Sequence, residues 1–420
     1  MKANRDLQII YFFSVLVAIY SISNYSPILL GDSPSYLDAW YNFKDGHIDK
    51  LRTPLYPLYL GVIKMIIGTK YFILMSIVGQ TILFLFSIYV FYKLAIRIVG
   101  HQNVAFWITL FYGTSLHINQ WNGMIMTESL SISGSIFMLY SILRLYDCYS
   151  LKWGMISAAI IMLLLLQRPS FIYILPVLIL GWLMCYREKK KQAIAGIVGV
   201  FISSAILFLY MYSFKQSYGI WTSSCVSTVN NYHIARQYNL LNPDVIKDAN
   251  LQADIDSILT YGYKFSGLVD ESDFFPEEVI KEENLIFSKY ELQTIDSAIR
   301  ASFESSPINY LKSVYIRFYK SAFNNAFIIF SRVKIDLFFI YLFLFIYGLI
   351  IIRWSLLKKC VPWMTIIIYL LCIGNILVSI IGAWAVWNRL IMPSIPLIIL
   401  LFGQFISLFR RKSLIQFDVI

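Results

Sequence analysis

Long apolar runs separated by short polar connections make up most of this chain of 420 residues. A helix needs roughly 20 mainly apolar residues to cross a bilayer, and most of the runs have about that length. Membrane β-strands would be shorter and would alternate apolar with polar positions. The pattern predicts an all-α polytopic membrane protein with about ten transmembrane helices. These lie near residues 7–28, 71–96, 103–119, 125–146, 152–167, 170–186, 192–213, 335–352, 361–382 and 390–409.

The stretch 54–68 is apolar but short, and Pro57 and Lys64 interrupt it. We interpret it as an interfacial helix in the first outer loop, because a span here would reverse the sidedness of every later connection. Three regions follow from this interpretation. They are an N-terminal transmembrane module (1–213) with a catalytic first outer loop (29–70), a small, mainly helical extracytoplasmic subdomain (214–334) and C-terminal transmembrane helices (335–420).

Charge supports one orientation of these spans. Residues 214–320 hold ten Lys/Arg and fourteen Asp/Glu, a net charge of −4. Because the whole chain has a net charge of +11, the remaining residues carry a net charge of +15. That surplus is concentrated in alternate short connections, above all in the basic segment 187–191, as the positive-inside rule requires of cytoplasmic loops. The basic charge therefore reports topology rather than a nucleic-acid partner. We expect an integral protein of the cytoplasmic membrane with both termini cytoplasmic and the functional face outside.

Composition agrees with this class: only 14% of residues are charged, against about 25% in soluble domains. The five cysteines have no paired spacing and predict neither a disulfide framework nor a Cys metal site. His47 lies between Asp45 and Asp49, a pattern that fits a solvated turn better than a metal site. We therefore expect no cofactor, and nothing in the sequence supports a divalent metal.

Candidate chemistry lies at the outer ends of the predicted spans. Asp32 follows the first span, where a carboxylate can act as a general base toward an acceptor hydroxyl. Arg52 precedes a proline-rich turn and suits a phosphate or carboxylate partner. Glu128 opens the fourth predicted span, where the helix dipole stabilises a carboxylate. The alternative for all three is that they are ordinary interfacial charges.

Two further arginines lie at outer span ends, against the positive-inside rule. Arg168 is in a very short outer turn, and Arg389 opens the last predicted span. Cations there require a partner, and a lipid phosphate is a natural one. His117 lies near the same boundary and either lines the same cavity or is structural.

Together these positions resemble the GT-C superfamily of membrane glycosyltransferases, in particular the bacterial branch of protein O-mannosyltransferases and aminoarabinose transferases. The matching segments occur in one order across nearly the whole chain. They are Asp32 with Tyr36, the segment 52–57 (RTPLYP), 127–129 (TES), 167–169 (QRP), 306–311 (SPINYL), and Asn388-Arg389 with Pro393 and Pro396.

The resemblance implies transfer of a sugar from a polyprenyl-phosphate carrier to an acceptor hydroxyl at the outer membrane face, with inversion. It makes Asp32 the catalytic base and Glu128 a support of the pocket. It also implies that Arg52, Arg168 and Arg389 contact the donor phosphate, and that Tyr36, Tyr56 and His117 line the pocket. Several branches of the family have two adjacent acids in the first loop, whereas Ser33 follows Asp32 here.

Two other functions remain open. A flippase or transporter of lipid-linked glycans would place ionisable residues near the bilayer midplane, but the predicted mid-span positions are almost purely apolar. An O-antigen-type polymerase or ligase would share the many spans and the large outer loop. The expected partners are a polyprenyl-phosphate sugar donor, an acceptor that is a glycan, lipid or protein, and membrane lipid.

Overall fold

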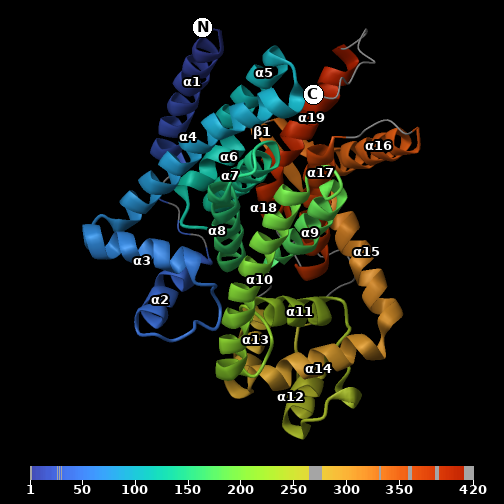
Figure 1. Cartoon of the computed structure of the whole chain (residues 1–420). Coiled ribbons are helices and arrows are strands. Elements are labelled where there is room, and N and C mark those ends of the chain that lie inside the picture. The colour runs from blue at the N-terminus through green and yellow to red at the C-terminus, as the bar shows by residue number, and fades with distance from the viewer. Residues whose placement is uncertain are drawn as a thin grey trace.

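The computed structural model describes residues 2–263 except positions 26, 28 and 30, together with 277–330, 333–357, 362–383 and 387–410. Pro276 and Cys360 lie outside the described residues, as does the side chain of Asn388. The described residues are mostly helical, and a bundle of long helices carries a smaller group of helices at one end (Figure 1).

Every predicted apolar run contains a helix. Six of the described helices are long and apolar enough to cross a membrane, which confirms a helical membrane protein. These six are α1 (Lys2–Tyr25), α4 (Phe72–Val99), α7 (Glu128–Asp147), α10 (Lys190–Tyr218), α16 (Leu337–Leu356) and α17 (Trp363–Gly382).

The other predicted spans are shorter helices. They are α5 (Gln102–Thr114), α8 (Leu151–Gln167), α9 (Ile174–Cys185) and α19 (Ile395–Arg410). Thirteen residues of helix, as in α5, cover about 20 Å, less than the ~30 Å of a hydrocarbon core. The number of ten spans therefore stays a prediction. Short helices link the bundle: α6 (Leu116–Gln120), α18 (Trp387–Leu390) and the 3₁₀ turns Trp121–Gly123, Pro169–Tyr173 and Met392–Ser394.

The first predicted outer loop contains two helices, α2 (Ser33–Lys44) and α3 (Leu55–Ile67), where the sequence predicted one. α3 coincides with the apolar stretch 54–68. The two helices cross so closely that a Cβ atom on Gly61 of α3 would lie 1.9 Å from Cδ2 of Trp40 on α2. A glycine at this crossing is what lets the indole ring pack onto α3.

A second hydrophobic core belongs to the helical subdomain, by which we mean α11–α15. Its apolar side chains, among them Tyr232, Leu251, Ile286 and Ile299, form a cluster separate from that of the bundle. Its elements are α11 (Val226–Gln237), a 3₁₀ turn (Pro243–Val245), α12 (Ala249–Tyr261), α13 (Glu277–Lys289), α14 (Leu292–Ser305) and α15 (Pro307–Phe323).

An antiparallel hairpin of β1 (Ala326–Phe330) and β2 (Val333–Asp336) joins the subdomain to α16. Ala326 pairs with Asp336 and Phe327 with Ile335. The prediction of an all-α chain did not include this hairpin, because its apolar residues continue directly into those of α16. The hairpin packs against α6, and Phe327 is buried there.

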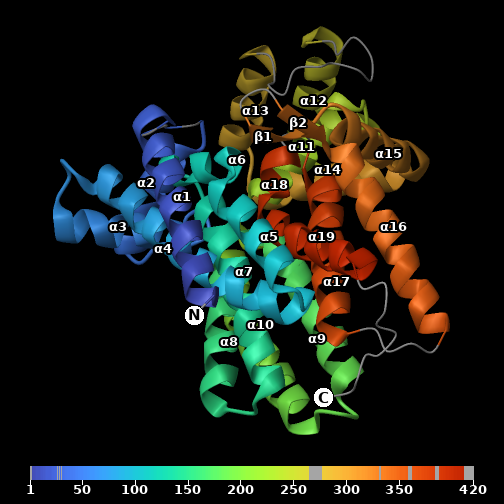
Figure 2. The same ribbon diagram turned by 90° about the horizontal axis from the view of Figure 1, so that it is seen from above.

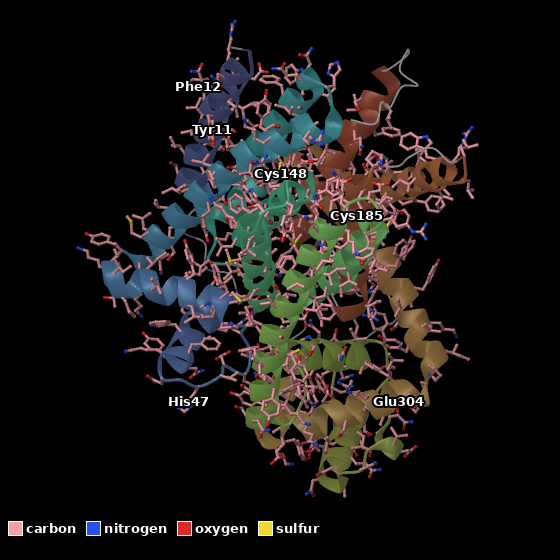
Figure 3. All side chains as sticks on the ribbon, viewed as in Figure 1. Tyr11, Phe12, His47, Cys148, Cys185 and Glu304 are labelled. Atoms are coloured by element: carbon pink, nitrogen blue, oxygen red, sulfur yellow. The ribbon has the colours of Figure 1, made fainter. Side chains whose placement is uncertain are left out.

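The subdomain lies at one end of the bundle, away from the start of α1 and the end of α19 (Figure 1 and Figure 2). Figure 3 shows His47 and Glu304 in the lower half of the view and Cys148 and Cys185 in the upper half. The polar connections of the first loop and the subdomain are thus separated from the basic connections that follow α7 and α9. The membrane sidedness of the two groups stays a prediction from the charge pattern.

Candidate functional site

A chain of ion pairs joins five charged side chains from distant parts of the sequence. Arg52 Nη2 lies 2.8 Å from Asp32 Oδ1, and Arg389 Nη2 lies 2.8 Å from Asp32 Oδ2. Arg389 Nε also donates to Glu128 Oε1 at 2.5 Å, and Arg168 Nη1 lies 3.5 Å from that same oxygen. The structure therefore brings together all five charged residues that the sequence singled out.

The most exposed member of the chain of ion pairs is Asp32, which lies between Arg389 and Arg52, and Arg52 is 13% exposed. The side chains of Glu128 and Arg168 are 0% and 8% exposed, Arg389 is 19% exposed and Asp32 is 36% exposed. Three arginines against two carboxylates leave one positive charge in a largely desolvated place. Such a site attracts an anion, because charge interactions are strong where water is excluded.

Asp32 is placed by the start of α2. It is the N-cap residue of that helix, where an aspartate normally accepts a backbone N–H. Here the side chain makes no capping bond, and its two oxygens are bound by Arg52 and Arg389 instead. Burial would raise the pKa of the Asp32 carboxyl, but the charges and hydrogen bonds of Arg389 and Arg52 lower it to about 2. In this state Asp32 is ionised and only weakly basic.

Arg168 and Glu128 are placed by the ends of two neighbouring helices. Pro169 disfavours helical backbone in the residue before it, so α8 ends at Gln167 and Arg168 is extended (φ −148°, ψ 133°). Glu128 is the first residue of α7. An arginine at a helix C-terminus and a glutamate at a helix N-terminus each complement the helix dipole. The local sequence therefore favours the pairing of Arg168 with Glu128 independently of Arg389.

Arg52 is held by three residues at the start of α2. Its Nε donates to Ser35 Oγ at 2.7 Å and its Nη1 donates to Tyr36 Oη at 3.2 Å, in addition to the ion pair with Asp32. The guanidinium carbon also lies 4.2 Å from the centroid of the Tyr36 ring, a distance at which cation and ring attract.

The backbone around Arg52 is fixed by Asp49. Asp49 Oδ1 accepts the N–H groups of Leu51 and Arg52 at 2.9 and 2.6 Å, and Oδ2 accepts from Asn42 Nδ2 at 2.7 Å. From the sequence we expected Asp49 only in a solvated turn. Because these three hydrogen bonds are with neighbours within seven positions, an Asx-type turn before Arg52 is the signal that would have found it.

Neutral hydrogen bonds tie together the segments that carry the charges. Thr53 Oγ1 donates to the carbonyl of Gln167 at 2.7 Å, and Gln167 Nε2 donates to the carbonyl of Thr127 at 2.8 Å. Ser33 Oγ donates to the carbonyl of Ile125 at 3.0 Å. Each of these side chains is buried, and each is adjacent to a charged residue of the site. These bonds fix the spacing of Arg52, Arg168, Glu128 and Asp32.

The predicted pocket residues separate into two groups. Tyr36 touches Arg52, and Tyr56 is fully buried with its ring 5.1 Å from that of Tyr36. His117 instead packs against Trp121 and Phe327, and its described contacts do not include the charged residues. The structure therefore favours the structural role that the sequence left open for His117.

No protein-family model matches the sequence, and no curated protein matches it.

Proposed function

We propose that this chain is a membrane glycosyltransferase of the GT-C type, which transfers a sugar from a polyprenyl-phosphate donor to an acceptor hydroxyl at the outer membrane face. The observation that carries the proposal is the ion-pair chain of Asp32, Arg389, Glu128, Arg168 and Arg52. It combines one partly exposed carboxylate with three arginines, which are the groups that this reaction needs.

The three arginines suit the leaving group. As the bond from the anomeric carbon to the phosphate oxygen breaks, its electron pair stays with the phosphate, which gains negative charge. Preplaced cations stabilise that charge in the transition state. Arg168 is the most buried of the three, and its Nη1 lies 3.5 Å from Glu128 Oε1 without making a hydrogen bond among the described residues. In the proposed reaction this N–H turns from Glu128 to a phosphate oxygen when the donor binds.

Asp32 suits the acceptor. We assign it as the general base that takes the hydroxyl proton while the acceptor oxygen attacks the anomeric carbon from the face opposite the phosphate. A base works best when its pKa is near the working pH, and in the ligand-free protein two arginines oppose this. A bound phosphate competes for the same arginines. Donor binding thereby frees Asp32 and raises its pKa, so the base becomes active only beside a donor.

The test is consumption of polyprenyl-phosphate sugars by the purified protein in lipid nanodiscs, followed by mass spectrometry of the lipid. We expect one such lipid to lose its sugar and become polyprenyl phosphate. Asp32→Asn should abolish this transfer while leaving expression and membrane insertion intact, and full activity of that variant would remove the assignment of the base. A transporter would instead move the lipid across the membrane of a vesicle without changing it chemically.

Arg389→Ala should weaken donor use more than acceptor use, because Arg389 is assigned to the phosphate. A matched control is Arg97→Ala, whose arginine forms an exposed ion pair with Asp147 at the other end of α7. Equal effects of Arg389→Ala on donor and acceptor would argue against the phosphate role.

A further inference from the structure

The end of α17 lies beside the helical subdomain, close in sequence to the site. α17 ends at Gly382, and Arg389 follows on α18 (Trp387–Leu390). Both α11 and α15 pack against α17. On its other side, Asn375 of α17 donates through Nδ2 to the carbonyl of Leu390, the residue after Arg389, at 3.3 Å. The position of α17 and the position of Arg389 are therefore linked.

Arg317 of α15 binds the last turn of α17. Its Nη1 donates to the carbonyls of Ile380 and Ile381 at 3.0 and 2.7 Å. On its own helix, Nε donates to the carbonyl of Ser313 at 3.3 Å. The carbonyls at the end of a helix lack partners within the helix and carry partial negative charge. A guanidinium can donate hydrogen bonds to these carbonyls, and its positive charge is attracted to their partial negative charge.

Arg317 is fully buried, which is costly for a charged group without a counter-ion. None of the ion pairs found among the described residues includes it. The carbonyls of α17 are therefore its main compensation. An arginine in this position is poorly explained as a surface charge and well explained as a cap for α17.

The remaining carbonyls of this turn are also satisfied. The carbonyl of Ser379 accepts the N–H of Ala383 at 3.1 Å, and the carbonyl of Gly382 accepts from Nδ2 of Asn230 on α11 at 2.9 Å. Of the last four carbonyls of α17, the subdomain therefore binds three. Without the subdomain these three groups would need other partners.

We propose that Arg317 is a positioning residue for Arg389: from α15 it holds the end of α17, and with Asn230 it makes the helical subdomain set the geometry of the anion site. The proposal rests on the proposed function for its meaning in catalysis, but its structural part stands without it. The subdomain also reaches the opposite side of the site, because the N–H of Cys225 binds the carbonyl of Lys50, two residues before Arg52, at 2.9 Å.

The experiment is hydrogen–deuterium exchange of the full chain in nanodiscs, combined with calorimetric titration of farnesyl phosphate as a phosphate-headed probe. In Arg317→Met we expect faster exchange confined to residues 380–383 and 387–391 and at least about tenfold weaker binding of the probe. Arg317→Lys should restore part of both losses, because an ammonium group can still bind a helix-end carbonyl. Arg300→Met is the matched control, since Arg300 is an exposed arginine of the subdomain.

Unchanged exchange at 380–383 and 387–391 in Arg317→Met would overturn the proposal. Faster exchange spread evenly over the subdomain would also overturn it, because that pattern indicates a merely structural role. If Arg317→Met does not fold, Asn230→Ala and Arg317→Lys decide the question by the same exchange measurement. Failure of the wild-type protein to bind farnesyl phosphate would count against the proposed function. The exchange result would still decide whether Arg317 positions the segment of Arg389.

Discussion

At the scale of single residues, the site combines charges that would be costly to bury alone. Glu128 is fully buried and faces two arginines, while Asp32 is partly exposed and faces two. Arg389 is shared by both carboxylates. Removing one member of such a group leaves its partners buried without compensation, which typically costs more than the intact pair contributes.

We expect Glu128→Gln to lower the stability of the protein by about 3–5 kcal/mol, because Arg168 and Arg389 then lose their buried counter-charge. The measurement is thermal unfolding of the purified protein in detergent. Asp147→Asn is the control, since Asp147 pairs with the largely exposed Arg97, and such pairs contribute about 0–1 kcal/mol. Similar melting temperatures for the two variants would contradict the buried network.

Donor binding should also shift the pH dependence of transfer. Asp32 must be ionised to accept a proton, so activity is lost as pH falls through its pKa, which is about 2 in the free protein. A bound phosphate draws the arginines away and raises that pKa. Because kcat/KM reports the free protein and kcat the complex, the acid limb of kcat should lie at higher pH than that of kcat/KM. Coincident acid limbs would show that the donor does not free Asp32.

At the scale of elements, the site depends on how closely α2 and α3 cross. α2 carries Asp32 at its start, and the loop before α3 carries Arg52. Trp40 fills the space over Gly61, where no Cβ fits. The crossing therefore sets the distance between a carboxylate and an arginine of the site.

Gly61→Ala should force α2 and α3 apart, with a cost in stability of about 1–3 kcal/mol and a loss of transfer activity. Gly154→Ala is the matched control, because the nearest atom to a Cβ on Gly154 of α8 is 4.0 Å away. Activity assays and thermal unfolding of both variants check this. An active Gly61→Ala variant would mean that the crossing does not control the site.

Residues and elements that could be predicted from the sequence are those that an apolar run makes conspicuous. Asp32, Glu128, Arg168 and Arg389 could be found because each interrupts or borders an apolar run, where a charge is conspicuous. Arg317 could not, because its partners are backbone carbonyls 63 and 64 positions away, and carbonyls leave no mark in a sequence. The helices were predicted by apolar length, but α2 and the β1–β2 hairpin, which lack such runs or merge with one, were not.

At the scale of the whole molecule, the basic connections and the helical subdomain lie at different ends of the bundle (Figure 2). We infer from the positive-inside rule that the basic end is cytoplasmic. Cys148, in the connection between α7 and α8, is an exposed free cysteine, whereas Cys225 is buried. The two sides can thus be distinguished by chemical labelling.

In a Cys360→Ser background, a membrane-impermeant maleimide should label Cys148 only after the cells are permeabilised. A cysteine introduced by Ser297→Cys, at an exposed position of α14, should be labelled in intact cells. Labelling is read by the mass shift of the purified protein. The reverse pattern would place the ion-pair chain on the cytoplasmic side and remove the proposed reaction.

The sharing of Arg389 between two carboxylates has a consequence for biosynthesis. Asp32 with Arg52, and Glu128 with Arg168, are two neutral pairs encoded in the first 168 residues, so the nascent chain can insert both without a lone charge. Arg389, which joins them, leaves the ribosome only after the subdomain has been made, since domains emerge in N- to C-terminal order. A chain interrupted before that point carries both pairs but not the third cation, and a prematurely released fragment would be inert.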